Sequence, residues 1–178
     1  MTSSLPATEV PTPQSFDLAS TLTLTPAEIP PLHATPRSVP FRTLARGFRL
    51  GGALPQPTLL AAVDRAGRDA VIALVSPQHR ALLEATDLQR EALLAVFRET
   101  MPSGGYAISI NAVAVTDSEL IVGVTLSEDD PAFPKIEAAT LPYHIIAIDR
   151  SVLSQRPNWR YRLVSGNTLL AIGELVPR

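Results

Sequence analysis

Alternating apolar residues fill the second half of this 178-residue chain, and they limit its fold more than any other feature. The alternation runs from Tyr106 to Ile110, changes parity before Val113, and resumes over residues 120–126. A period of two is typical of strands with one buried face. The change of parity predicts a β-bulge near Asn111. Without an extra residue at that point, the apolar side chains after it would face solvent instead of the core.

Glycine and proline mark the turns and strand ends of this stretch. Gly104 and Gly105, inside the loop 102–105, predict a hairpin between a strand at 91–98 and the strand that begins at Tyr106. The chain turns over residues 116–119 and returns as the antiparallel strand 120–126. A last strand, 141–148, follows the polar loop 127–140 and carries Pro142 at its start, where a missing N–H costs least.

The residues before this stretch predict further strands and one helix. Residues 41–50 form a strand with a turn or bulge at Gly47, and residues 59–63 form a short strand or a helical turn. We expect a tight turn at Gly67 and a buried central strand over 69–75. Ser76 and Pro77 then start a helix of about ten residues, with the serine hydroxyl as N-cap. Residues 159–164 and 168–172 form a hairpin around the turn 165–167 that covers a sheet edge.

The first forty residues contain eight prolines. Such spacing excludes helices and central strands and predicts an extended or disordered tail, with an open alternative of a short edge strand at 21–24. We therefore divide the chain into a Pro-rich tail, 1–40, and one folded domain, 41–178. The predicted fold class of that domain is α+β, mainly antiparallel sheet with one short helix.

Composition excludes several function classes. The formal charge of -2 gives no general attraction to phosphate backbones, so nucleic-acid binding is disfavoured. No cysteine is present to form a disulfide or a thiolate site. The first residues show no basic and apolar export signal, and no apolar run is long enough to span a bilayer. As written, the sequence predicts a cytoplasmic location.

The residue types used in catalysis and metal binding form no recognisable pattern. The three histidines, His33, His79 and His144, lack the spacing of metal ligands, and Glu128-Asp129-Asp130 lacks the remainder of a calcium loop. We expect no metal and no cofactor. Ser103, His144 and Asp149 can be combined into a hydrolase triad only if folding brings them together. That alternative stays open.

Two tyrosines stand out because each begins a strand beside glycine or proline and combines apolar area with a hydroxyl. Tyr106 follows Gly105, and Tyr143 follows Pro142. We expect both to line one end of the sheet. Gly104, Gly105, Tyr106, Pro142 and Tyr143 are accordingly the candidate partner-binding residues.

The segment from Gly104-Gly105-Tyr106 through residues 120–124 to Thr140-Leu141-Pro142-Tyr143 resembles the C-terminal domain of the PrcB family of bacterial protease-complex subunits. The resemblance implies a non-enzymatic accessory protein that binds and stabilises a protease, with no catalytic residues to carry over. It also implies export, if the N-terminus is processed or truncated. The sequence departs from the family pattern at Ser103, where threonine is common, and at Asp149, where proline is usual.

Three functions follow from these observations. The leading one is an accessory domain that binds a protein partner without spanning a membrane, and the resemblance implies that this partner is a protease. The alternatives are a hydrolase with a dispersed site at Ser103, His144 and Asp149, and a small-ligand or nucleic-acid binding module. This last would use the arginines of two predicted strands, which are Arg42, Arg46, Arg49, Arg160 and Arg162.

Overall fold

The computed structural model describes residues 35–128, 136–154 and 158–175. These residues form nine strands, three α-helices and one 3₁₀ helix. The strands are β1 (Arg37–Ser38), β2 (Phe41–Leu50), β3 (Thr58–Ala62), β4 (Glu91–Phe97), β5 (Ala107–Val115), β6 (Glu119–Ser127), β7 (Thr140–Asp149), β8 (Trp159–Ser165) and β9 (Thr168–Leu175). The helices are α1 (Arg65–Ile72), η1 (Pro77–His79), α2 (Arg80–Glu84) and α3 (Arg150–Ser154).

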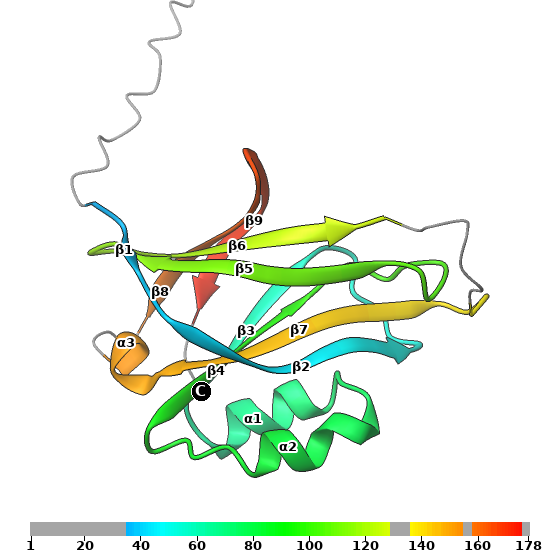
Figure 1. Ribbon diagram of the computed structural model, residues 1–178, viewed down its shortest axis with the longest axis horizontal. Helices are drawn as coiled ribbons and strands as arrows, with labels where there is room; N and C mark the ends of the chain where they lie inside the picture. Colours follow the sequence, from blue (N-terminus) through cyan, green and yellow to red (C-terminus); the bar gives the residue numbers. More distant parts are fainter. Residues whose placement is uncertain (1–34, 129–135, 155–157, 176–178) are drawn as a thin grey trace, which may run out of the picture. The chain divides into compact units, whose positions relative to one another are not determined.

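The strands make two sheets that pack face to face (Figure 1). The first has the order β1-β5-β6-β8-β9 and the second the order β2-β7-β4-β3. All neighbouring strands are antiparallel except β6 and β8. Helices α1 and α2 lie against the outer face of the second sheet, which gives three layers (Figure 1).

Two apolar cores follow from this layering. Alternate residues of β7 divide between them, because successive side chains of a strand point to opposite faces. Ile146 and Ile148 pack between the sheets, whereas Tyr143 and Ile145 pack beneath α1 and α2. Strand β7 lies between β2 and β4 in its sheet. Both its faces are buried, because the first sheet covers one and the helical layer covers the other.

Most of the predicted strands are confirmed. The bulge near Asn111 is present as a register shift between Ile110 and Ala112 in the β5–β6 pair. The turn before β6 is closed by the Thr116 amide, which donates to the Glu119 carbonyl at 2.9 Å. The C-terminal hairpin is β8–β9, with Gly166 at a φ of 56° in its turn. The prediction of a mainly antiparallel α+β fold is therefore correct, although the helices are more numerous than the one expected.

The buried strand predicted for residues 69–75 is wrong. This segment belongs largely to α1, whose first turn is capped by the Asp64 side chain accepting from the Gly67 amide at 2.8 Å. Gly67, Val71 and Val75 are the buried positions, and their spacing of four residues is helical. The helical period overrides the apolar run, and Gly67 lies inside the helix and not at a tight turn.

The hairpin predicted at residues 102–105 is also wrong. Strand β4 belongs to the second sheet and β5 to the first, so the loop carries the chain from one sheet to the other. Neither Gly104 nor Gly105 adopts a positive φ. The position of the predicted bulge in β2 also differs, because the register of β2 on β7 shifts between Thr43 and Ala45 and not at Gly47.

The helix predicted from Pro77 is present as η1 and α2. The Ser76 side chain makes no capping hydrogen bond; instead its amide donates to the Tyr143 hydroxyl at 3.1 Å. The predicted tail lies outside the described residues up to position 34, as does the possible strand at 21–24. Residues 37–38 already pair with β5, so sheet structure starts ahead of Phe41. Within the described part of the chain, no helix is long and apolar enough to cross a membrane.

Candidate functional site

The loop 102–106 lies at one end of the sandwich, where it is tied to the start of β7. The Thr140 hydroxyl donates to the Ser103 carbonyl at 2.6 Å, and the Gly104 amide donates to the Ile136 carbonyl at 3.0 Å. Met101 forms an isolated β-bridge with Thr140. The loop is thus held in place by hydrogen bonds from both its ends.

Arg98 packs against the Tyr106 ring at the same end of the sandwich. Its guanidinium carbon lies 5.1 Å from the centre of the Tyr106 ring, within range of a cation–π interaction. The side chain also donates to the Ser127 carbonyl at 2.9 Å and to the Glu128 carboxylate at 3.1 Å. Arg98 is only 4% exposed. It therefore joins the ends of β4, β5 and β6 around Tyr106.

Exposed apolar side chains surround this loop. Leu50 is 58% exposed and Ile136 is 48% exposed, which places them among the most exposed large apolar residues described. A Cβ added at Gly104 would lie 3.5 Å from Ile136 Cβ and 3.6 Å from Phe48 Cζ. Leu50 follows Phe48 by two residues on the same side of β2. We call this surface, formed by Phe48, Leu50, Gly104, Tyr106 and Ile136, the Tyr106 end.

Only part of the candidate set lies at this surface. Gly104, Gly105 and Tyr106 are partly exposed, whereas Pro142 and Tyr143 are buried. Phe48, Leu50 and Ile136 were missed by sequence reasoning, although Leu50 stands before Gly51-Gly52, where a strand must end. The binding role of the five candidate residues stays a prediction, and the two buried ones can act only through their neighbours.

Tyr143 lies on the opposite face of the second sheet from the sandwich core. Its hydroxyl lies 2.7 Å from His79 Nδ1 and accepts the Ser76 amide at 3.1 Å. Burial raises the pKa of Tyr143 above its usual value, so the hydroxyl keeps its proton. Gly47 lies opposite Tyr143, and a Cβ added there would be 3.4 Å from His79 Cε1. The Tyr143 hydroxyl therefore links Ser76 and His79, which precede α2, to β7 by hydrogen bonds.

The three residues of the possible hydrolase triad are spread along β7. Ser103 lies beside Thr140 at the start of the strand, and Asp149 ends it. Ten strand residues span about 30 Å, so these two positions are far apart. His144 lies between them, and both of its ring nitrogens are engaged by other groups. The geometry does not assemble this set.

His144 instead connects the two sheets. It is fully buried, and its Nδ1 accepts the Ile110 amide of β5 at 2.7 Å. Nε2 must then carry the proton, which it donates to Thr43 Oγ1 at 3.0 Å. The Ile110 amide lies at the bulge of β5, where the register on β6 shifts. The imidazole thus satisfies a buried donor that the strand ladder leaves unpaired.

We predict a pH-dependent stability from this arrangement. Burial and the positive charge of Arg46 lower the pKa of His144 from 6.5 to about 4. Above pH ~6.5 the imidazole is neutral in both states and its contribution is complete. Between these two values only the unfolded chain takes up the proton, so the free energy of unfolding should fall by roughly 3 kcal/mol as the pH falls. Urea unfolding from pH 7.5 to 4.5 measures this loss.

The control for this pH series is His144→Asn, which has no group that titrates in the window. Over the same pH range, the free energy of unfolding of this variant should fall less than that of the wild type. The difference between the two should equal the roughly 3 kcal/mol assigned to the titration of His144. Equal pH slopes for the wild type and the variant would contradict the assignment.

The arginines considered for ligand or nucleic-acid binding belong to two different sheets. Arg42, Arg46 and Arg49 lie on β2, and the other two lie on β8. Several are engaged already: Arg42 pairs with Glu91, and Arg162 donates to Glu119 at 2.7 and 2.9 Å. Among the described residues, no group of three or more histidines and carboxylates is placed to hold a metal ion.

The comparisons with known proteins concern the central part of this fold. No curated protein and no solved structure matches the chain. A family model described as PrcB C-terminal matches residues 92–149. The matched residues comprise nearly all of β4 together with β5, β6 and β7, and hence the Gly104-Gly105-Tyr106 loop and Pro142-Tyr143. The match therefore supports a PrcB-family C-terminal domain over residues 92–149, as the resemblance predicts.

Proposed function

We propose that this chain is a non-enzymatic accessory protein that binds a protein partner through the Tyr106 end, and that the partner is a protease. The family match supports a protease-related interaction domain. The observation that carries the proposal is the exposure of Leu50 and Ile136 beside a loop held by hydrogen bonds.

Exposed apolar side chains on a rigid surface are what protein interfaces use as anchors. Burial of a leucine or isoleucine side chain contributes roughly 1.5–3 kcal/mol, and such contacts dominate binding when they are central to the interface. The partly exposed Tyr106 ring adds apolar area and a hydroxyl at the same place. Because Arg98 and Thr140 fix the loop, little ordering entropy is lost when a partner binds.

The test is an affinity purification from the native organism, followed by measurement of protease activity and of the affinity of the recovered partner. We expect the wild type to retain a protease, and Leu50→Ser or Ile136→Ser to bind it roughly tenfold more weakly, as expected for the loss of one apolar anchor.

Leu82→Ser is the matched control, because Leu82 is 45% exposed but lies on α2. This variant should bind like the wild type. Recovery of partners without protease activity would reject the protease, and equal affinities for the Leu50, Ile136 and Leu82 variants would reject the Tyr106 end.

A further inference from the structure

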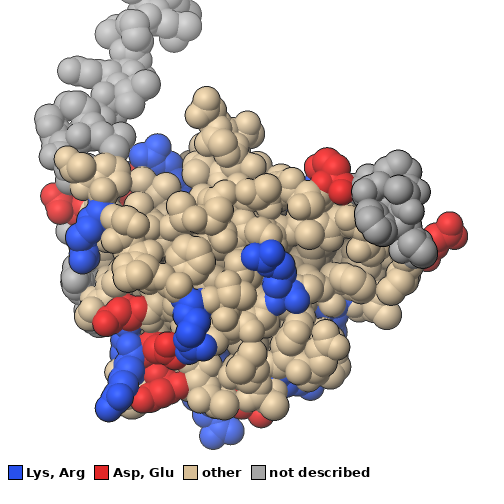
Figure 2. Space-filling view, viewed as in Figure 1, with Lys and Arg blue, Asp and Glu red and all other residues tan. Residues whose placement is uncertain are grey.

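The first sheet ends in an edge strand, β9, whose outer side is open. Strand β9 pairs with β8, and among the described residues no other strand or loop forms hydrogen bonds with it. Alternate residues of an edge strand direct their backbone N–H and C=O groups away from the sheet. The β8–β9 hairpin projects from the sandwich (Figure 1), and the same projection carries no charged side chain on the face seen in Figure 2. Strand β9 thus offers a free edge for pairing with another strand.

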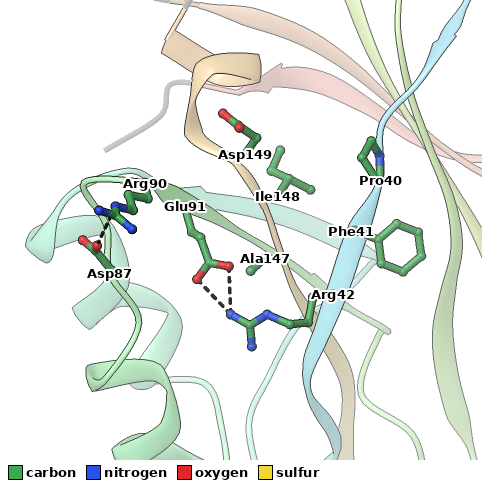
Figure 3. Close-up of a pocket in the computed structure, with 9 residues that line it drawn as sticks. All are labelled: Pro40, Phe41, Arg42, Asp87, Arg90, Glu91, Ala147, Ile148 and Asp149. Atoms are coloured by element: carbon green, nitrogen blue, oxygen red, sulfur yellow. Dashed lines mark hydrogen bonds and ion pairs between the residues drawn. The ribbon is translucent and has the colours of Figure 1, made fainter.

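The two edges of the sandwich differ in their charge. The edge strand β2 carries Arg42, Arg46 and Arg49 among its ten residues, and Arg42 is paired with Glu91 (Figure 3). Charged side chains on an edge strand oppose pairing with a second strand. The opposite edge is formed by β9 and, in the second sheet, by β3, which contacts it. The five residues of β3 and the eight of β9 include one charged residue, Glu174. This edge therefore lacks the protection that β2 has.

An extra residue in β9 gives its exposed apolar side chains a symmetric order. The register on β8 shifts at Leu170, which has no residue directly opposite it. Leu169 and Ile172 therefore both face away from the core and are 53% and 62% exposed. Leu170 and Ala171, between them, are partly buried against the core. The order exposed, half-buried, half-buried, exposed is the same in both directions along the strand.

A strand with this symmetric order is complementary to a second copy of itself about a two-fold axis. When two such strands lie antiparallel with the axis between Leu170 and Ala171, each Leu169 lies opposite Ile172 of the other copy, on the same face. Side chains that lie directly opposite in an antiparallel pair have Cβ atoms about 5 Å apart. The exposed apolar side chains of β9 are then buried in pairs, which a strand without this symmetry would not achieve.

The charges beside β9 agree with this register. The register places Glu174 beside Asn167 of the other copy, whose side-chain amide can donate to a carboxylate. Arg160 lies directly opposite Glu174 in the β8–β9 pair and balances its charge within one copy. Arg162, the other basic residue of β8, donates to Glu119 at 2.7 Å. Among the described residues, no like charges meet across the axis, as an interface between identical chains requires.

We propose that two copies of this chain associate through β9 and join their first sheets into one continuous sheet across a two-fold axis. Backbone hydrogen bonds between the two β9 strands hold the copies together, and the paired side chains of Leu169 and Ile172 set the register. This inference does not depend on a protease partner or on the Tyr106 end, because no residue of that surface belongs to β9.

Analytical ultracentrifugation of the full chain over about a hundredfold range of concentration tests the association. We expect the wild type to approach twice the mass of one chain, which is 19.1 kDa. Ile172→Lys should raise the dissociation constant at least about tenfold, because it replaces a paired apolar side chain by a charge. Leu82→Lys is the matched control, since Leu82 is 45% exposed but lies on α2, and it should leave the dissociation constant unchanged. A wild type that stays monomeric, or equal losses in the two lysine variants, would overturn the proposal.

The register can be tested by cross-linking, because the chain contains no cysteine of its own. Leu169→Cys and Ile172→Cys are prepared separately and oxidised alone and as a mixture. The proposed register brings the two different positions together across the axis. Identical positions lie more than about 10 Å apart, beyond the roughly 7 Å between Cα atoms that a disulfide can bridge. We expect disulfide-linked dimers on a non-reducing gel from the mixture and few from either variant alone. Cross-linking of the single variants as fast as that of the mixture would contradict the two-fold pairing of β9.

Discussion

His144→Ala should lower the free energy of unfolding by about 3–5 kcal/mol, one of the two largest effects that we expect from a single substitution in this chain. Two losses combine. The imidazole is fully buried between the sheets, so its removal leaves a cavity. The Ile110 amide also loses its acceptor in a place that water does not reach. Urea unfolding, with the midpoint and slope compared between variants, measures the change.

His144→Asn separates these two losses. The asparagine carbonyl oxygen occupies nearly the position of Nδ1 and can accept the Ile110 amide, so this variant should lose roughly half as much stability as the alanine variant. Hydrogen exchange at Ile110 gives an independent readout: protection should fall in the alanine variant and persist in the asparagine variant. A loss below about 1 kcal/mol for the alanine variant would show that the link between the sheets contributes little.

The local period of the sequence was sufficient to predict most of the strands. The parity change at Asn111 even located the bulge, because the same side chains must stay buried on both sides of it. It did not reveal which sheet each strand joins. Strands β4 and β5 are neighbours in sequence, yet the loop between them crosses from one sheet to the other. That choice depends on the pairing of β4 with β7, which lies far along the chain.

The error at residues 69–75 has a different cause. An apolar run of this length fits a buried strand and a helix equally well, and the deciding signals were Asp64 as N-cap and the four-residue spacing of Gly67, Val71 and Val75. Those signals were present in the sequence. They were outweighed by Gly67, which was interpreted as a turn residue because glycine is uncommon inside a short helix.

The candidate site was predicted in part for a related reason. Tyr106 and Tyr143 occupy similar sequence contexts, but their parities place them in different layers. Tyr106 lies over Arg98 on the sandwich side, whereas Tyr143 points to the helical layer. A strand pattern predicts two faces without saying which one a helix covers. For that reason the sequence grouped two tyrosines that the fold separates.

The second of the two largest expected losses of stability is at Tyr143. Tyr143→Ala should lower the free energy of unfolding by about 3–5 kcal/mol, because it empties a fully buried site beside Phe97 and removes the acceptor of the Ser76 amide. Tyr143→Phe keeps the ring and should lose about 1–2 kcal/mol, the cost of the missing hydroxyl. Urea unfolding of the three proteins gives both differences, and equal stabilities of the phenylalanine and alanine variants would show that ring packing is not the main contribution.

The same variants distinguish a structural tyrosine from a binding one. Tyr143→Phe should bind the partner of the Tyr106 end with unchanged affinity, because no atom of this buried side chain reaches the surface. Tyr106→Ala should instead weaken the complex. It should lower the free energy of unfolding by only about 1 kcal/mol, because the Tyr106 ring is partly exposed. Affinity and unfolding measured side by side test both statements, and weakened binding by a fully folded Tyr143→Phe protein would place Tyr143 in the interface after all.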